Sequence, residues 1–211
     1  MTIYEKFREI SVVPVVVLND SKDAQPLAKA LVDGGLPCAE VTFRTEAAKE
    51  SIRLMKEEYP DMLVGAGTVL TTAMVDEAIE AGAEFIVTPG LNEDVVKYCI
   101  EKSIPVTPGC MDTYAIEKAM ALGLSTVKFF PAEAAGGVKM IKALSGPYRN
   151  LSFMPTGGIN EKNIADYLEL PQVIACGGSW MVPSKKIDAG EFDEITDIVK
   201  EAVETVKKVR G

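Results

Sequence analysis

The chain contains no histidine among its 211 residues. Histidine is the commonest general base and a frequent metal ligand, so its absence removes every Ser-His and Cys-His catalytic pair. Any proton transfer must then fall to glutamate, aspartate, lysine or tyrosine.

Cysteine is scarce as well, with four in the chain. Cys38, Cys99, Cys110 and Cys176 are far apart and form no CxxC pair. They are too few to indicate a disulfide framework, and we expect reduced thiols that mostly fill the core.

Long apolar stretches and basic clusters are also missing. No stretch approaches the roughly twenty apolar residues that span a bilayer, and residues 1–6 lack the apolar core of a signal peptide. Lys and Arg number 22 against 31 Asp and Glu, which gives a net charge of -9. These features argue against binding to membranes or nucleic acid and predict a cytoplasmic protein in which an anionic substrate needs a local site.

What the chain does contain is a recurring strand-then-helix unit. Apolar runs predict strands at residues 12–18, 38–43, 63–66, 84–88, 104–107, 125–130, 152–156 and 173–176. Helical patterns lie at residues 21–34, 45–58, 71–81, 92–102, 112–122, 138–144, 160–168 and from 191 towards the C-terminus. Eight strands alternating with helices, without a linker, predict one (β/α)8 TIM barrel domain over residues 1–211.

The ends of the helices carry further signals. An amphipathic segment at residues 2–10 predicts an extra N-terminal helix that covers one end of the core. Ser21 is expected to cap the helix that follows the first strand. The form Ala-x-x-x-Gly, which ends at Gly34, Gly82 and Gly123, predicts a left-handed glycine after each of three helices.

Lys128 interrupts a short apolar run that ends in proline. In a strand it shares a face with Thr126 and Phe130, because alternate side chains point the same way. If that face lines a barrel interior, the amine is poorly solvated, which favours the uncharged nucleophile that Schiff-base chemistry requires. A lysine that snorkels, or that lies on an edge strand, is the alternative interpretation.

In such a barrel the chemistry lies at the carboxyl ends of the strands. Glu40, Thr42 and Arg44 are two residues apart at the end of the second strand, so their side chains point to the same face. A carboxylate, a hydroxyl and a guanidinium are therefore expected to converge there. An internal Glu40–Arg44 ion pair that only holds the barrel end explains the same pattern. The third strand ends at residues 65–68, where small residues leave space and Thr68 offers a hydroxyl, or where the chain simply turns.

Two glycine pairs follow the last two strands, in Thr156-Gly157-Gly158 and in Gly177-Gly178-Ser179. Glycine pairs let backbone N–H groups approach an anion, and these two loops often hold phosphate in barrel enzymes. Each pair can also mark only a turn. Trp180 is expected to pack and to position its loop.

Metal ligands are sparse at the strand ends. Hard metals in barrels need several convergent carboxylates, and at most two, Glu40 and Glu133, are suitably placed. The sequence therefore predicts a reaction without a metal and without a cofactor.

Six blocks stand in order along the chain, at residues 40–45 (EVTFRT), 65–69 (GAGTV), 88–90 (TPG), 128–133 (KFFPAE), 156–159 (TGGI) and 177–180 (GGSW). Together they resemble the 2-keto-3-deoxy-6-phosphogluconate (KDPG) aldolases, also called 4-hydroxy-2-oxoglutarate aldolases. The resemblance extends over essentially the whole chain. It implies a class I aldolase that releases pyruvate, with Lys128 as the Schiff-base lysine and Glu40 as the acid-base group.

The resemblance also implies the contacts with a small keto-acid substrate. The residues carried over for the pyruvate end and its surroundings are Arg44, Thr68, Pro89 and Phe130, and those for the phosphate end are Gly158, Gly178 and Ser179. Thr156 and Gly157, in the same loop as Gly158, are also expected to bind the substrate. The family is similar in being homotrimeric and metal-independent.

One stretch departs from the family. Its usual Pro-Gly-x-x-Thr-Pro-Thr-Glu-like run is replaced here by residues 108–115, PGCMDTYA. Asp112 keeps an N-cap acceptor, whereas Ala115 lacks the reciprocal glutamate of a capping box, so the following helix is expected to survive. Two other functions stay open from the residues alone: a phosphate-binding isomerase or synthase in which Lys128 only donates charge, and a non-catalytic trimeric barrel scaffold.

Overall fold

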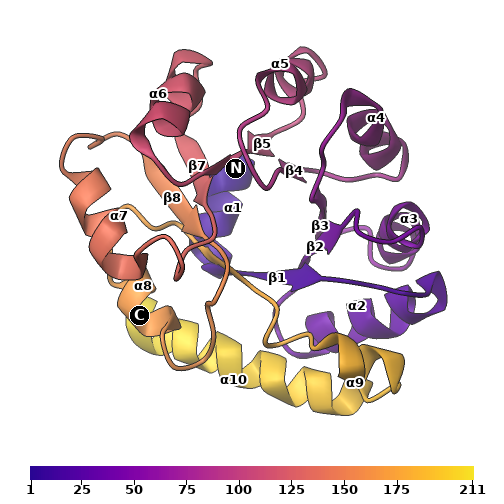
Figure 1. The fold of residues 1–211 in the computed structure, drawn as a ribbon. Helices are drawn as coiled ribbons and strands as arrows, with labels where there is room; N and C mark the ends of the chain where they lie inside the picture. The colour runs from indigo at the N-terminus through magenta and orange to yellow at the C-terminus, as the bar shows by residue number, and fades with distance from the viewer.

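A computed structural model describes residues 1–211, in which helices surround a parallel, curled set of strands (Figure 1). The strands are β1 (Val12–Val16), β2 (Cys38–Thr42), β3 (Leu63–Gly67), β4 (Ile86–Val87), β5 (Val106–Thr107), β6 (Gly109–Cys110), β7 (Thr126–Phe129), β8 (Ser152–Pro155) and β9 (Cys176–Gly178). Six of them form one sheet in the order β5-β4-β3-β2-β1-β9, and β6-β7-β8 form a second. Isolated parallel bridges from Phe153 to Val173 and from Thr156 to Gly177 connect β8 with the chain at β9.

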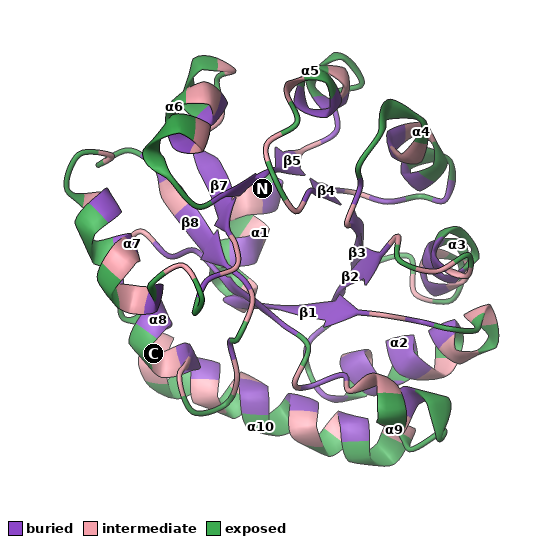
Figure 2. Cartoon of the chain, in the orientation of Figure 1, coloured by how far each residue is buried: buried purple, intermediate pink, exposed green.

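The helices alternate with these strands. They are α1 (Ile3–Ile10), the 3-10 helix η1 (Ser21–Asp23), α2 (Ala24–Asp33), α3 (Ala48–Glu58), α4 (Thr72–Glu80), α5 (Glu93–Glu101), α6 (Thr113–Ala121), α7 (Gly137–Ser145), α8 (Ile164–Leu168), α9 (Ser184–Asp188) and α10 (Phe192–Arg210). Strand residues are almost all buried, whereas the helices bury one face and expose the other (Figure 2). This is the pattern of strands covered by a helical layer.

Most expected elements form, but several boundaries differ. The strand expected at residues 104–107 is only β5, and β6 follows it as a separate strand. Pro108 stands between them, and proline has no N–H for a ladder hydrogen bond. Beyond the proline, Gly109 pairs with Lys128 of β7. The helix expected at 160–168 starts only at Ile164, and α9 forms where only a connection was expected.

Two of the predicted helix-end details are wrong. Asp20, and not Ser21, provides the cap, because its carboxylate accepts the Lys22 N–H at 3.0 Å and a 3-10 turn precedes α2. At the end of α2, Gly34 has a right-handed φ of -75°, and the left-handed residue is Gly35. Gly82 and Gly123 do have the expected positive φ.

The helix α1 covers one end of the core, as predicted. Its Phe7 is fully buried and meets Phe85 edge-on, with ring centroids 4.9 Å apart. These rings belong to a ten-residue cluster, separate from the main core, that also contains Cys38 and Leu63 from the first positions of β2 and β3. The amino ends of the strands are therefore closed by apolar packing, which leaves their carboxyl ends for a site.

Candidate active site

Lys128 lies on β7, between β6 and β8. Its neighbours in register are Gly109 and Met154, and its side chain is 5% exposed. A lysine is almost never this buried without a partner, because removing an ammonium group from water is costly. The interpretations as an edge or snorkelling lysine are therefore wrong.

Glu40 is the partner of this lysine. Its Oε1 lies 3.5 Å from Lys128 Nζ, and its side chain is 1% exposed. The second carboxylate oxygen, Oε2, is buried without a hydrogen-bond partner. A distance of 3.5 Å is long for a charge-assisted bond, so this pair is loosely held and has an unused acceptor.

The packing around Glu40 depends on a glycine. A Cβ atom on Gly67 would lie 2.2 Å from Glu40 Oε1, so only glycine at the end of β3 leaves room for the carboxylate. The space expected from the small residues at 65–68 is thus filled partly by Glu40 itself.

Phe130 supplies one wall beside the amine. Its ring centroid is 5.0 Å from Lys128 Nζ, which is within the range of a cation–π contact. Both side chains lie on the same face, as the alternation along the strand predicts. The ring also lines the cavity described below, so it contacts both the buried amine and the open site.

Arg44 reaches towards Thr68 and not towards Glu40. Its Nε donates to Thr68 Oγ1 at 3.2 Å, and no Glu40–Arg44 ion pair forms. Thr68 has a φ of 57°, a backbone conformation that costs a β-branched residue about 1–3 kcal/mol and that clusters at functional sites. Thr42, expected to converge with them, donates instead to the Val16 carbonyl at 2.9 Å and holds β1 to β2.

A cavity of about 470 Å³ lies at the carboxyl ends of β1, β7, β8 and β9. Seven of the expected site residues line it, namely Arg44, Phe130, Thr156, Gly157, Gly158, Gly178 and Ser179. Gly177, of the second predicted glycine pair, lines it as well, and the other six lining residues were not expected: Val15, Val17, Ile159, Val182, Pro183 and Ser184. Alternation along β1 predicts that Val15 and Val17 share the inward face, but nothing in the sequence points to Val182, Pro183 and Ser184.

The two glycine-rich loops present free donors to this cavity. The backbone N–H groups of Gly158 and Ser179 donate no hydrogen bond within the chain. Thr156 Oγ1 is buried and also lacks a partner. Thr156 is buried, and buried polar groups are rarely left unpaired, whereas Gly158 and Ser179 are exposed and their N–H groups are open to a ligand. Together these groups are suited to bind an anion.

Some expected residues lie outside the cavity lining. Pro89 is half-buried at the end of β4, and its carbonyl leaves no room for a side chain on Gly109, which pairs with Lys128. Thr68 is joined to the cavity through Arg44. Lys128 and Glu40 do not line it either, but Lys128 Nζ is 5.0 Å from the ring of Phe130, which does.

The departing stretch keeps its helix, as predicted. Asp112 Oδ1 accepts the Ala115 N–H at 2.8 Å, and α6 begins at Thr113. Trp180 is partly buried against the main core, which also agrees with the prediction.

The remaining polar chemistry is simple. No group of three or more Cys, Asp or Glu side chains is placed to hold a metal ion. All four cysteines are free and buried, and burial raises the pKa of Cys99 and of Cys110 to about 12.

None of the helices is both long enough and apolar enough to cross a membrane.

Comparison with known proteins identifies relatives over almost the whole chain. The family model described as KDPG and KHG aldolase matches residues 3–198. A 2-dehydro-3-deoxy-phosphogluconate aldolase of Haemophilus influenzae is 53% identical, over 97% of each chain. A KDPG aldolase structure from Legionella pneumophila, with pyruvate captured as a covalent carbinolamine, superimposes with a TM-score of 0.92 at 39% identity, covering 96% of this chain and 98% of the other. The Zymomonas mobilis enzyme with 3-phosphoglycerate has a TM-score of 0.89 at 42% identity and covers 95% of both chains.

Proposed function

The chain belongs to the KDPG and KHG aldolase family, and from this premise we propose that it cleaves KDPG into pyruvate and glyceraldehyde 3-phosphate through a lysine imine. The same chemistry would split 4-hydroxy-2-oxoglutarate into pyruvate and glyoxylate. The observation that carries the proposal is the buried Lys128–Glu40 pair, which contacts Phe130 of a cavity with free anion donors.

Lys128 acts as the nucleophile in this mechanism. Its uncharged amine attacks the C2 ketone to give a carbinolamine, and loss of water then gives a protonated imine. The imine accepts the electron pair of the C3–C4 bond when that bond breaks, so the aldehyde leaves and an enamine remains. Protonation of the enamine at C3 and hydrolysis of the imine release pyruvate and restore the amine.

Glu40 moves the protons of these steps. It lies 3.5 Å from the reacting nitrogen, and its Oε2 has no competing partner. In our proposal it assists loss of water from the carbinolamine, takes the proton of the C4 hydroxyl and returns one to the enamine, directly or through water. One carboxylate can serve as base and as acid, because the proton that it takes in one step is available to be returned in the next.

The two ends of the substrate are held by different groups. We assign the pyruvate carboxylate to Arg44 and Thr68, with Phe130 as an aromatic wall and Pro89 as a further contact. The phosphate is assigned to the loops that contain Thr156, Gly157, Gly158, Gly178 and Ser179, whose backbone donors meet an anion without a dedicated lysine or arginine. Binding energy from this remote end helps to orient the reacting centre.

The test compares pyruvate release from two substrates. KDPG is expected to have a higher kcat/KM than 4-hydroxy-2-oxoglutarate, because its phosphate reaches the donor loops. Ser179→Asp should erase this preference by placing a like charge there, with a loss of ~3 kcal/mol, about a hundredfold, in kcat/KM for KDPG. The measurement is the initial rate of pyruvate formation from each substrate.

A matched control adds the same charge elsewhere. Ser125→Asp alters an exposed serine next to the amino end of β7, and both kcat/KM values should stay close to those of the parent. Equal kcat/KM values for the two substrates in the parent chain would show that the glycine loops are ordinary turns, and the phosphate assignment would be withdrawn.

We also propose that the two sheets are arcs of one (β/α)8 barrel with an extra N-terminal helix, forming a single domain over residues 1–211. The bridges between β8 and β9 support this closure. The family relationship and the four free thiols support a cytoplasmic enzyme.

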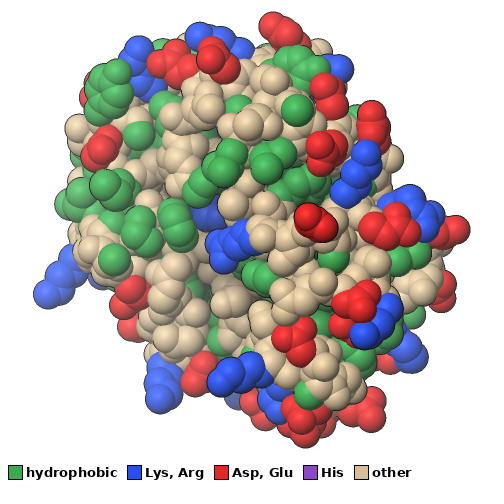
Figure 3. Space-filling view, turned by 45° about the vertical axis from the view of Figure 1, so that its right-hand side comes forward, with side chains coloured by type: hydrophobic (Ala, Val, Ile, Leu, Met, Phe, Trp, Pro, Cys, Tyr) green, Lys and Arg blue, Asp and Glu red, His purple; other side chains and the backbone are tan.

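A homotrimer is the assembly that we propose. Large apolar side chains are exposed at Leu70 (49%), Met111 (53%) and Tyr114 (71%). Figure 3 shows hydrophobic side chains gathered on the left of one face, where charged groups are sparse. Light scattering is expected to give three times the monomer mass, and a monomer would contradict this proposal.

A further inference from the structure

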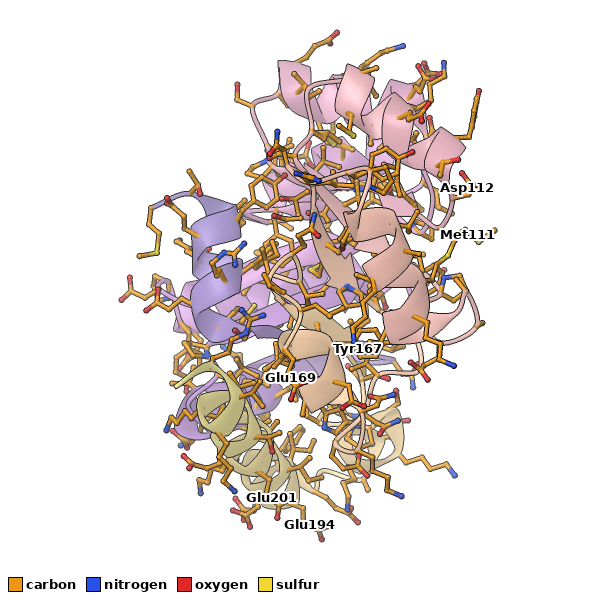
Figure 4. The ribbon with its side chains drawn as sticks, turned by 90° about the vertical axis from the view of Figure 1, so that its left-hand side faces the viewer. Met111, Asp112, Tyr167, Glu169, Glu194 and Glu201 are labelled. Carbon is orange, nitrogen blue, oxygen red and sulfur yellow. The ribbon has the colours of Figure 1, made fainter.

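Glu133 and Tyr167 form a hydrogen-bonded pair behind the glycine loop that follows β8. Glu133 ends the motif that begins at Lys128, and Tyr167 lies on α8. The Tyr167 hydroxyl donates to Glu133 Oε1. Figure 4 shows Tyr167 at the level of α8, beside α7. Neither residue has a part in the mechanism described above.

The stem of Glu133 supports Gly158 from behind. A Cβ atom on Gly158 would lie 2.6 Å from Glu133 Cγ, so the loop backbone rests directly on this side chain. The backbones are joined as well: the Glu133 N–H donates to the Gly157 carbonyl at 3.1 Å, and the Ala132 N–H donates to the Thr156 carbonyl at 2.8 Å. The loop that presents the Gly158 N–H is therefore held by the chain that follows Lys128.

The carboxylate of Glu133 points away from the substrate cavity. Glu133 does not line that cavity, but it lines a second one of about 340 Å³, together with Tyr167 and the first residues of α7. The start of a helix is a favourable place for a negative charge. Tyr167 is fully buried, and burial raises its pKa, so that its hydroxyl keeps the proton that it donates to Glu133.

We propose that Glu133 and Tyr167 are positioning residues that hold the Gly157-Gly158 loop in its anion-binding form and keep a carboxylate charge out of the anion site. Without the Tyr167 hydroxyl, the carboxylate is free to turn towards the Gly158 N–H. There it would compete with the substrate phosphate for the same donor and would repel it. This inference rests on the proposed function, because it assigns a role to the supports of the phosphate loop.

The test removes the Tyr167 hydroxyl and compares the kinetic constants for the two substrates. Tyr167→Phe keeps the buried ring and is expected to raise KM for KDPG about tenfold, the effect of one charge-assisted hydrogen bond, with kcat little changed. For 4-hydroxy-2-oxoglutarate, which has no phosphate, kcat/KM should stay within about twofold of the parent. A purely structural role would impair both substrates together.

Four further variants make the test decisive. Glu133→Ala should reproduce the KM effect, and the Tyr167→Phe/Glu133→Ala double variant should be no worse, since residues that act as one unit are not additive. Glu133→Gln still accepts the hydrogen bond and should retain most of the parent KM. Tyr148→Phe is the matched control, because the Tyr148 hydroxyl donates to Glu117 at 3.0 Å on an exposed surface, and its KM values should not change.

The outcomes are distinguishable. If the parent chain releases no pyruvate from KDPG, the proposed function fails. If the parent prefers KDPG, but both Tyr167→Phe and Glu133→Ala leave KM for KDPG unchanged or impair the two substrates equally, the positioning role alone is refuted. Glu133 is exposed, so its alanine variant is expected to fold. It therefore tests the positioning role even if Tyr167→Phe fails to fold.

Discussion

Lys128→Met is expected to lower kcat/KM for KDPG by about 10⁴-fold or more, because loss of a covalent nucleophile removes the whole imine route. Methionine has a similar length and no charge, so it fills a site where the lysine side chain is only 5% exposed. The variant should therefore fold. Pyruvate release measures the loss, and circular dichroism checks the fold.

Trapping locates the reacting amine directly. Incubation of the parent chain with pyruvate and borohydride should add one pyruvyl-derived group, located on Lys128 by peptide mass spectrometry, while a chelator leaves activity unchanged. Lys56→Met is the control, because Lys56 is also partly buried and pairs with Glu84 at 2.8 Å, and neither residue lines the cavity. Its activity and its labelling should match the parent.

Trapping and the pyruvate-release assay together separate the alternative functions. An isomerase or synthase that used Lys128 only as a charge donor would give no adduct, and a non-catalytic scaffold would release no pyruvate. Labelling at another lysine, or complete loss of activity on chelation, would overturn the mechanism.

Glu40→Gln is expected to slow turnover by about a hundredfold or more, because positioned acid-base groups typically contribute at least that much. Glutamine has the same shape and still offers an acceptor to Lys128, so the buried packing beside Gly67 is retained. Both pyruvate release and the rate of imine trapping should fall, since Glu40 acts in the formation of the imine and in the cleavage.

Glu84→Gln is the matched control for this change. Glu84 is half-buried and pairs with Lys6 and Lys56, at 3.5 and 2.8 Å, outside the cavity lining. It should lose some stability and no activity. Nearly normal turnover of Glu40→Gln would mean that Glu40 is only the structural partner of Lys128.

The sequence was sufficient for the order of most elements, although it indicated neither β6 nor α9, and for the candidate site residues. A period of two along the strands placed Lys128 and Phe130 on one face, and recurring helix patterns indicated the surrounding helices. The N-cap at Asp112 was also predictable from the sequence, because an N-cap hydrogen bond joins residues only three apart. The predicted N-cap at Ser21 was wrong, because the adjacent Asp20 provides the acceptor.

Contacts between distant segments needed the tertiary structure. Glu40 and Lys128 are 88 residues apart, and the sequence left Glu40 with Arg44 as its equally plausible partner. Parity along one strand cannot tell which inward residue of another strand lies opposite, because register and curvature of the sheet decide it. In the structure Glu40 pairs with Lys128, and Arg44 donates a hydrogen bond to Thr68.

The available residue types follow from the sequence alone: one lysine in a buried strand, no histidine, and two glycine pairs where parallel strands end. How these residues meet depends on the folded chain, in which the carboxylate of Glu40 occupies the space beside Gly67, and Glu133 supports Gly158 while accepting a hydrogen bond from Tyr167. Side-chain chemistry and period are local properties of a chain, whereas close packing between strands and loops depends on every segment at once.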